Sequence, residues 1–410
     1  MPTPVDEETA ERVRGYVLEA VPHWCRAADI VVQRLYGGIS NCIYRCDRAP
    51  GAAAGTPADA TVVVRVIGTG GSVLVDRGVE VRLCVRLGAA GRCPAVHGIF
   101  DGGYVTSFVP GRALDRAGCL AHRDDIAREL ARWHAVDCAA ALGPPRLMLW
   151  ARVQHWADLL RAVPPAPRHD WRAAAALLDA ELAPLAAHLD AVGARLVRGA
   201  LPPVAVCHND VNPTNIMADD DAAGRPRNPA APVVFIDLEY AFYNNPLFDI
   251  AHHFLDLGGM ELDPALVPDP AWQRAFLRAY LAQWAADHPR GDRPRGEPPA
   301  HCPFCAHSAP PQDAPAPRPV DDALLADIAQ AAEHWQLAVH LLWGVWALFS
   351  AALCEHKDST HGISHDDEFD FYDFAQLRFD RYVATRLKLG LPPTPLRAFT
   401  HSPQDWPAPS

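Results

Sequence analysis

The chain has 410 residues, of which half are hydrophobic and 21% charged, and its formal net charge at pH 7 is −12. This composition is typical of a globular protein, and the length allows one large domain or two modest ones. The acidic balance argues against a nucleic-acid-binding protein, which normally carries a basic face, and suits partners that are metal ions or cationic small molecules.

The N-terminal residues and the cysteines indicate the compartment. MPTPVDEETAERVRGYVLEA is acidic and lacks an apolar core segment, so we expect no secretory signal. The eleven cysteines are odd in number and mostly stand singly, as in VRLCVRLG. This pattern predicts reduced thiols in a cytoplasmic protein rather than a disulfide framework.

The first 110 or so residues are expected to form a small antiparallel sheet with one helix. An amphipathic helix is predicted over residues 5–28 and is followed by a strand, a glycine turn and a second strand in DIVVQRLYGGISNCIYRC. TVVVRVIG reads as a strand, VDRGVEVRLCVRLGAAG as a helix that ends at glycine, and AVHGIFDGGYVTSFVPGRAL as two strands around an Asp-Gly-Gly turn. We assign residues 1–110 to an N-terminal lobe.

From about residue 120 the pattern is helical, so we assign residues 111–400 to a second, mostly helical lobe and the whole chain to the α+β class. Helices are predicted over DDIARELARWHAV and over residues 171–195, 247–257, 271–287, 320–355 and 370–388. Residues 288–319 are proline-rich without periodicity, which predicts a mobile surface insertion.

One apolar stretch, LAVHLLWGVWALFSAALC (337–354), is long enough to cross a membrane. It carries His340 and Ser350, and its two tryptophans lie in the middle rather than at the ends. We therefore expect a buried core helix and no stable membrane insertion.

Two polar stretches in the second lobe carry residues suited to phosphoryl transfer. VCHNDVNPTNIM places Asp210 and Asn215 on a loop that apolar residues close at both ends. In VVFIDLEY, Asp237 follows an apolar strand, and on a strand it would face the same side as Glu239. Transfer from a nucleotide needs Mg²⁺ held by oxygen ligands and a carboxylate that accepts a hydroxyl proton. Any one of these residues alone would be a turn cap, but the set in this order favours a kinase.

These motifs resemble those of a known family. HNDVNPTNIM looks like the phosphotransferase motif shared by choline and ethanolamine kinases, aminoglycoside kinases and, more distantly, protein kinases. IDLEYAFYNNPLFDIAHHFLD resembles the more specific choline/ethanolamine kinase pattern, and the likeness extends from about Leu35 to Gly390. The matching positions are Asp237, Glu239, Tyr240, Tyr243, Asn244, Phe248, Asp249, Ile250, His253 and Phe254, with Asp256 where glutamate is usual.

The resemblance implies a bilobal, protein-kinase-like fold that uses ATP and Mg²⁺. Asp210 would be the catalytic base, with Asn215 and Asp237 as metal ligands. Arg65, in VVVRVIG, would lie over the phosphates and be held there by Glu80. YGGISN resembles the phosphate-covering turn and SFVPGR the hinge that meets adenine, which assigns nucleotide-binding roles to Gly37, Gly38, Ser40, Asn41, Arg65, Ser107 and Phe108.

The alcohol end of the site follows partly from physical chemistry. Acids and aromatic faces bind an ammonium group, and Trp343 and Trp346 share one face of a helix. A tryptophan pair on an apolar helix is more often plain core, but LLWGVW and FYDFAQLRF resemble the cation-pocket helices of the family. The resemblance assigns substrate-binding roles to Asp210, Tyr240, Asp256, Trp343, Trp346 and Phe374, the last of which replaces a tyrosine of choline kinases.

The sequence therefore predicts an enzyme that phosphorylates the hydroxyl of ethanolamine, and also of choline, in the first step of the CDP-alcohol route to phospholipids. LGGMELDPALVPDPAWQRAFLRAYL, VLVDRGVEV and FVPGRALD look more like the ethanolamine branch, whereas GGISNCIYRC looks more like the choline branch. The alternatives are a choline-preferring kinase, an aminoglycoside phosphotransferase and a non-catalytic scaffold. The sequence leaves open whether the chain forms a homodimer.

HCPFCAH, within the insertion, raises the question of zinc. Cys302 and Cys305 have His301 and His307 nearby, but a lone CxxC without a second pair is a weak zinc motif. We expect no catalytic role for it.

Overall fold

The structure is a computed structural model that describes residues 5–24, 26–35, 41–49, 60–67, 73–164, 170–288, 320–355 and 369–400. The predicted glycine turn at 36–40, the insertion and its CxxC motif lie outside these residues. The chain divides into two compact units. The first comprises the described residues up to Arg112 together with Met217–Glu239, and the second comprises the rest. This division differs from the predicted boundary because residues 217–239 group with the N-terminal part.

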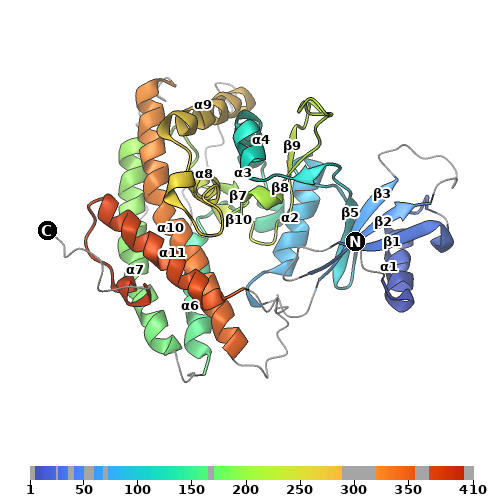
Figure 1. Cartoon of the computed structure of the whole chain (residues 1–410), viewed down its shortest axis with the longest axis horizontal. Coiled ribbons are helices and arrows are strands. Elements are labelled where there is room, and N and C mark those ends of the chain that lie inside the picture. Colours follow the sequence, from blue (N-terminus) through green and yellow to red (C-terminus); the bar gives the residue numbers. More distant parts are fainter. Residues whose placement is uncertain are drawn as a thin grey trace. The chain divides into compact units, whose positions relative to one another are not determined.

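The first unit is built on a five-stranded sheet in the order β1-β2-β3-β5-β4, with every neighbouring pair antiparallel (Figure 1). Branched and aromatic residues favour these strands because they pack well on a pleated surface. The elements are α1 (Glu7–Ala20), β1 (Ile30–Leu35), β2 (Asn41–Arg48), β3 (Thr61–Ile67), α2 (Arg77–Ala89), β4 (Val96–Phe100) and β5 (Gly103–Ser107).

The core of this unit lies between α1 and one face of the sheet. Val13 and Val17 of α1 are fully buried against Val64 of β3 and Val105 of β5, which are register partners. Alternate residues of a strand point to the same face, so Val62 and Val64 enter the core together. The predicted α1 extended to residue 28, but the helix ends at Ala20 because Pro22 disfavours helical geometry at the residue before it.

Two short strands continue the first unit after the chain returns to it. β8 (Ile216–Ala218) and β9 (Val233–Phe235) are hydrogen-bonded neighbours. At one place the backbone approaches too closely for any side chain: a Cβ on Gly111 would lie 2.1 Å from the carbonyl oxygen of Ala218. Gly111 also has a φ of +97°, so glycine is required there on both counts. A two-residue strand, β6 (Arg112–Ala113), follows it.

The second unit is mostly helical, and α10 lies at its centre. The 34-residue α10 packs against α6, α8, α9 and α11 (Figure 1). Most of its residues are buried. A Cβ on its Gly344 would lie 2.8 Å from the Phe379 ring, so glycine is what allows α11 to approach. The elements are α3 (Arg116–Ala121), α4 (Arg123–His134), α5 (Ala139–Leu142), α6 (Leu149–Ala162), α7 (Trp171–Val192), β7 (Ala205–Cys207), β10 (Phe242–Asn244), α8 (Pro246–Asp256), α9 (Pro270–Asp287), α10 (Asp322–Glu355) and α11 (Phe371–Lys388).

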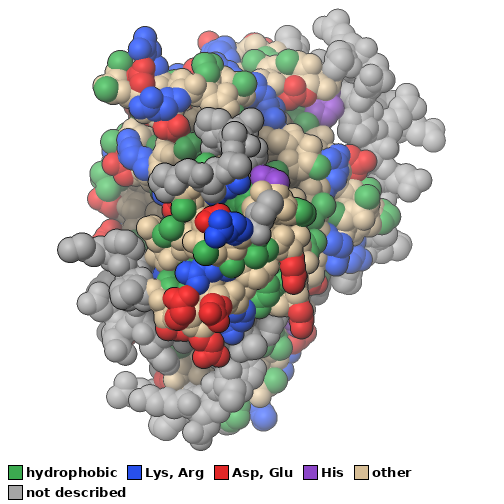
Figure 2. All heavy atoms as spheres, turned by 90° about the vertical axis from the view of Figure 1, so that its right-hand side faces the viewer, with side chains coloured by type: hydrophobic (Ala, Val, Ile, Leu, Met, Phe, Trp, Pro, Cys, Tyr) green, Lys and Arg blue, Asp and Glu red, His purple; other side chains and the backbone are tan. Residues whose placement is uncertain are grey.

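The small antiparallel sheet and the mostly helical remainder confirm the predicted fold class. By length and composition α10 could span a membrane, but 89% of its most hydrophobic window is buried inside the fold, as predicted for a core helix. The face drawn in Figure 2 carries basic and acidic side chains interspersed with apolar ones. Each of the eight cysteines in the described part of the chain is a free thiol.

Candidate active site

The loop after β7 fixes the side chain of Asp210. Asn212 begins a short 3₁₀ turn, Pro213–Asn215, by accepting hydrogen bonds from the backbone N–H groups of Thr214 and Asn215 at 2.9 and 3.2 Å. Its side-chain nitrogen donates to Asp210 Oδ1 at 2.9 Å, and Asn215 Nδ2 donates to Asp210 Oδ2 at 2.8 Å. The carboxylate is thus oriented by two amides, and 18% of the side chain remains exposed.

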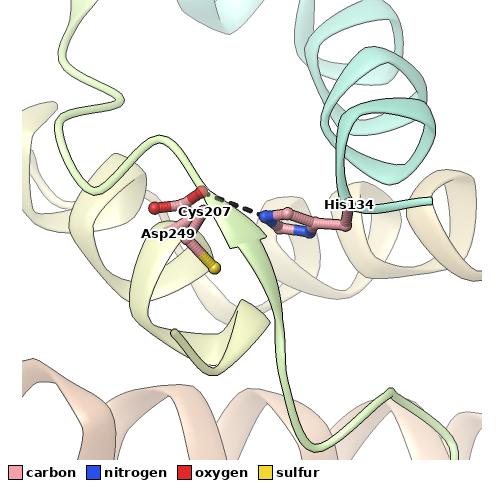
Figure 3. Close-up of side chains that lie close together, drawn as sticks. All are labelled: His134, Cys207 and Asp249. Carbon is pink, nitrogen blue, oxygen red and sulfur yellow. Dashed lines mark hydrogen bonds and ion pairs between the residues drawn. The ribbon is translucent and has the colours of Figure 1, made fainter. Parts of the chain in front are cut away.

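The backbone just before Asp210 is held by a buried carboxylate on α8. Asp249 accepts the backbone N–H groups of His208 at 2.8 Å and of Asn209 at 2.7 Å. It also accepts a hydrogen bond from His134 Nε2 at 3.0 Å, drawn as the dashed line in Figure 3. Because a carboxylate can only accept hydrogen bonds, His134 Nε2 carries the hydrogen in this contact, and His134 Nδ1 lies 2.7 Å from the Tyr280 hydroxyl.

This arrangement makes Asp249 an anchor of the loop. Burial alone would raise the pKa of Asp249, but the hydrogen bond and charge interaction with His134 bring it below its ordinary value. Asn209 has a φ of +64°, a conformation uncommon for a side-chain-bearing residue, and two further bonds hold it there. Its Nδ2 donates to the carbonyl oxygen of Tyr240 at 2.9 Å, and its Oδ1 accepts from Asn244 Nδ2 at 2.8 Å.

Cys207 lies beside His134 and Asp249, and the three residues present donor atoms within 4.8 Å of one another (Figure 3). Both oxygens of Asp249 already accept N–H hydrogens. Burial raises the pKa of the Cys207 thiol, with a further contribution from the Asp249 charge. A neutral thiol and an occupied carboxylate are poor metal ligands, so this cluster stabilises the fold of the loop.

A second group of charged residues lies within the first unit. Arg65 Nη1 donates to Glu80 Oε1 at 2.9 Å and to the Tyr104 hydroxyl at 3.2 Å, and Arg65 Nη2 donates to Asp237 Oδ1 at 2.8 Å. Although burial opposes the charge, Asp237, Tyr104 and Glu80 raise the pKa of Arg65 well above its ordinary value. The structure therefore brings together the three residues Arg65, Glu80 and Asp237 that the sequence assigned to phosphate and metal binding.

The sequence suggested that Asp237 and Glu239 lie on one face of a strand, but in the structure they do not. β9 ends at Phe235, and Asp237 has a φ of +64°, so the alternation of a strand no longer applies. Glu239 instead accepts a hydrogen bond from Arg77 at 2.8 Å, while Arg77 also donates to Glu80 at 2.7 Å. Burial, and then the charge of Asp237, raises the pKa of Glu239. Arg77 was not predicted, because its role depends on partners up to 162 residues away in the sequence.

The other predicted nucleotide-binding residues are described only in part. Gly37, Gly38 and Ser40 lie outside the described residues, and Asn41 opens β2 with its side chain outside them as well. Ser107 ends β5, where its hydroxyl is 2.9 Å from His97 Nε2. The ring of Phe108 is half-buried under the Arg45 guanidinium, 4.6 Å from its centroid.

The predicted aromatic residues of the alcohol site lie together in the second unit. The Tyr240 ring is edge-on to Trp343 at 5.1 Å, and Trp343 is edge-on to Trp346 at 5.5 Å. Trp346 Nε1 donates to the Tyr240 hydroxyl at 2.9 Å, which fixes both rings. Phe374 is connected to this group through Phe369, at 5.4 Å, and the ring contacts that follow it. The cluster offers aromatic faces of the kind that bind cations.

Asp256, at the end of α8, connects the acidic and aromatic parts. Its Oδ1 is 3.5 Å from Nη2 of Arg378, whose guanidinium lies over the Phe374 ring at 4.9 Å. Its Oδ2 is 3.6 Å from His252 Nε2, and the same nitrogen is 3.6 Å from Asp210 Oδ1. The imidazole of His252 is also 5.7 Å from the Trp343 ring.

Sequence reasoning missed Arg378 and His252. Asp256 is four residues after His252 on α8, so the i, i+4 spacing places them on one face, and this signal could have found His252. It was overlooked because His253 is the position that matches the family pattern. His253 in fact lies with its Nδ1 3.1 Å from the Val211 carbonyl oxygen, and burial lowers its pKa to about 4, so it remains neutral and structural.

Comparison with known proteins identifies the family to which the chain belongs. The family model for choline/ethanolamine kinase matches residues 32–383. Ethanolamine kinase 2 of Mus musculus is 30% identical over 90% of this chain and 80% of its own length, and probable choline kinase 1 of Arabidopsis thaliana is 25% identical over 78% and 77%. The solved structure of a Plasmodium vivax ethanolamine kinase shares the fold, with a TM-score of 0.64 and 17% identity over 96% of this chain and 91% of that one. The chain is therefore an enzyme that belongs to the choline/ethanolamine kinase family.

Proposed function

We propose that this enzyme transfers the γ-phosphoryl group of ATP to the hydroxyl of ethanolamine, and less efficiently to that of choline, in an Mg²⁺-dependent reaction. The product would enter the CDP-alcohol route to phosphatidylethanolamine and phosphatidylcholine in the cytoplasm. One observation supports the proposal most strongly. Oxygens of a fixed carboxylate, Asp210, and of a second acid, Asp256, each lie 3.6 Å from one imidazole nitrogen, His252 Nε2, and the same ring packs against Trp343. A hydroxyl acceptor and an ammonium site are thereby combined within one unit.

The reaction needs no covalent intermediate with the protein. Asp210 accepts the hydroxyl proton as the alcohol oxygen bonds to the γ-phosphorus, and the bond between that phosphorus and its bridging oxygen breaks to release ADP. Asn212 and Asn215 each donate to a different oxygen of Asp210, at 2.9 and 2.8 Å, so the base is oriented before substrate binds. Asp256 and the aromatic group of Tyr240, Trp343 and Trp346 would bind the ammonium end.

The residues assigned to Mg²⁺ have the oxygen chemistry that this ion requires. Asn215 uses its amide nitrogen on Asp210, which leaves its carbonyl oxygen for a cation. Asp237 uses Oδ1 on Arg65, which leaves Oδ2, and 30% of its side chain is exposed. Both are hard ligands of the type that holds Mg²⁺ together with nucleotide phosphates. The ion, when bound, would offset the negative charge on the phosphates, and Arg65 would add a permanent positive charge.

The preference for ethanolamine rests on the acid and on the sequence after α8. A primary ammonium must donate hydrogen bonds, which Asp256 can accept, whereas a trimethylammonium needs a more complete aromatic wall. After Asp256 the chain continues with small residues, LGGM, where choline kinases carry a bulky aromatic-rich stretch. Phe374 in place of tyrosine does not decide between the two alcohols.

An ADP-release assay with ethanolamine, choline and an aminoglycoside side by side tests the function. We expect turnover with ethanolamine and choline and none with the aminoglycoside. The Asp210→Asn variant is the matched inactive control. Competition between ethanolamine and choline at equal concentration, read by the mass of the products, tests the preference. An excess of phosphocholine would reverse the preference, whereas turnover of the aminoglycoside alone would refute the proposed substrate class.

A further inference from the structure

His252 is a buried histidine next to Asp210, Asp256 and Trp343 of the candidate alcohol site. Its side chain is fully buried, yet neither ring nitrogen has a hydrogen-bond partner among the described residues. Its Nε2 is 3.6 Å from Asp210 and 3.6 Å from Asp256, beyond the ~2.7–3.2 Å of a hydrogen bond. One nitrogen of the imidazole therefore faces both carboxylates without a hydrogen bond to either.

The packing around the ring explains why it cannot move toward one acid. Phe248 stacks on it with ring centroids 6.2 Å apart, and Trp343 packs against it at 5.7 Å. Both aromatic residues are buried, so the imidazole is held by rigid neighbours. Because each carboxylate packs against this fixed edge of the ring, the ring limits where Asp210 and Asp256 can lie and which way each can turn.

The separation of the two acids matches a short amino alcohol. One carboxylate oxygen of Asp210, one carboxylate oxygen of Asp256 and one ring nitrogen of His252 all lie within 4.8 Å of one another. The oxygen and nitrogen of ethanolamine are roughly 3–4 Å apart, given ordinary bond lengths and staggered torsions. A molecule of this length can place its hydroxyl on Asp210 and its ammonium on Asp256 at the same time. One additional methylene would displace one end from its acid.

We infer that His252 is a positioning residue that sets the spacing between the base and the ammonium-binding acid, and so selects two-carbon amino alcohols. The inference rests on the proposed function, because it assigns the hydroxyl to Asp210 and the ammonium to Asp256. His252 itself touches neither the phosphates nor the reacting hydroxyl in this scheme.

The charge of the imidazole matters for the same reason. Burial lowers the pKa of His252, the charge of Asp256 opposes this shift, and Arg378 from α11 adds to it. Other titratable groups that interact with the ring are Asp210, His208, Asp249, His253 and His340. Because burial lowers the pKa of this imidazole from its ordinary value, His252 stays neutral near pH 7 and gains a positive charge only in acid. A cation beneath the ammonium site would weaken alcohol binding, so the KM for the alcohol should rise as the pH falls.

Two variants separate positioning from mere packing. His252→Ala removes the ring that both acids face, whereas His252→Gln keeps a neutral side-chain N–H at a similar reach but cannot be protonated. The measurements are kcat and KM for ethanolamine and for 3-aminopropanol, from pH 5.5 to 8, with thermal unfolding and the KM for ATP as checks on folding. His340→Gln is the matched control, because His340 is also buried with an unpartnered Nδ1 but forms no ion pair with Asp210 or Asp256 among the described residues.

We expect the native enzyme to prefer ethanolamine over 3-aminopropanol by about tenfold or more in kcat/KM, the usual scale of discrimination for one methylene. His252→Ala should reduce this ratio to about twofold, mainly through a higher KM for ethanolamine. His252→Gln should keep the ratio but lose the rise in KM at low pH, and His340→Gln should change neither.

An unchanged length preference in His252→Ala would overturn the inference. If that variant does not fold, His252→Gln decides alone, and the inference fails if it loses the length preference or retains the native pH dependence. A native enzyme that phosphorylates no amino alcohol would refute the proposed function itself, which is a different result from an active enzyme with unaltered selectivity.

Discussion

Replacing Asp249 with asparagine should destabilise the second unit and reduce turnover together. The side chain is fully buried and accepts three N–H hydrogens, from His208, Asn209 and His134, at 2.7–3.0 Å. Asparagine has the same shape but only one acceptor oxygen. Its amide nitrogen must therefore face at least one of these donors, which then lies buried without a partner.

The magnitude follows from the bonds that are lost. A hydrogen bond to a charged group contributes about 1.5–3 kcal/mol, and a buried unsatisfied donor costs about 1–3 kcal/mol. The combined loss is about 3–5 kcal/mol against a typical total of 5–15 kcal/mol. For a unit of this size it corresponds to a fall of about 6–20 °C in Tm. Because Asp210 directly follows the anchored amides, a displaced base should also reduce kcat by up to about 10²-fold.

The pH dependence of this effect has a definite sign. The pKa of Asp249 is lowered in the folded state, so its contribution to stability is present above the ordinary aspartate pKa and is lost as the pH falls through the folded value. The difference in Tm between the native enzyme and Asp249→Asn should therefore be greatest near neutrality and shrink below about pH 4.

Calorimetric unfolding at several pH values, with kcat for ethanolamine, tests the prediction. Asp269→Asn is the matched control. Asp269 also accepts two backbone N–H hydrogens, at 2.8 and 2.9 Å, but it is an exposed helix cap, a position where asparagine serves equally well. A Tm for Asp249→Asn within about 2 °C of the native value would refute the role of the buried anion, since this shift corresponds to about 1 kcal/mol or less.

Three further variants test the assigned roles. Asp210→Asn should lower kcat by about 10²–10⁴-fold while Tm and nucleotide binding stay near native, and a near-native kcat would remove Asp210 as the base. Asp237→Ala should weaken Mg²⁺-nucleotide binding so much that added Mg²⁺ does not restore activity, whereas added Mg²⁺ should partly restore the activity of Asn215→Ala. If titration with Mg²⁺ restores the activity of both variants equally, Asp237 is not the stronger ligand. Trp346→Phe keeps an aromatic ring but removes the 2.9 Å bond to the Tyr240 hydroxyl, so the KM for ethanolamine should rise by about two- to tenfold with kcat little changed. An unaltered KM would show that this bond does not shape the alcohol site.

The sequence predicted what depends on local pattern and short motifs. Runs of apolar, strand-forming residues located β2 and β3, and the loop between apolar anchors located Asp210 and Asn215. It could not predict the partners that hold these residues, because they come from distant segments. His134 is 115 residues from Asp249, and Glu239 is 162 residues from Arg77. Such contacts depend on how the helices pack, which no spacing within one motif records.

The prediction that Asp237 and Glu239 share one face was wrong because of the backbone conformation at Asp237. The strand was expected to end at Asp237, and Asp237 and Glu239 were placed on one face by the alternation that a strand would give them. The left-handed backbone at Asp237 ends that alternation. The two carboxylates then reach different guanidinium groups, Arg65 and Arg77, and both guanidinium groups also donate to Glu80. A backbone conformation at one residue thus decided the pairing of the whole charged group.

This pairing suggests how the first unit can be ready for a nucleotide before one is present. Without a ligand, Arg65 offsets the charge of Asp237, so the buried acids are not left unpaired, which would be costly. Phosphates could take the guanidinium of Arg65 while Mg²⁺ takes the carboxylate of Asp237, so that each partner exchanges one opposite charge for another. Glu80 and Tyr104 would retain Arg65 during the exchange, since they bind its other nitrogen, Nη1, at 2.9 and 3.2 Å. On this reasoning Glu80 acts by keeping Arg65 in place when Asp237 releases it.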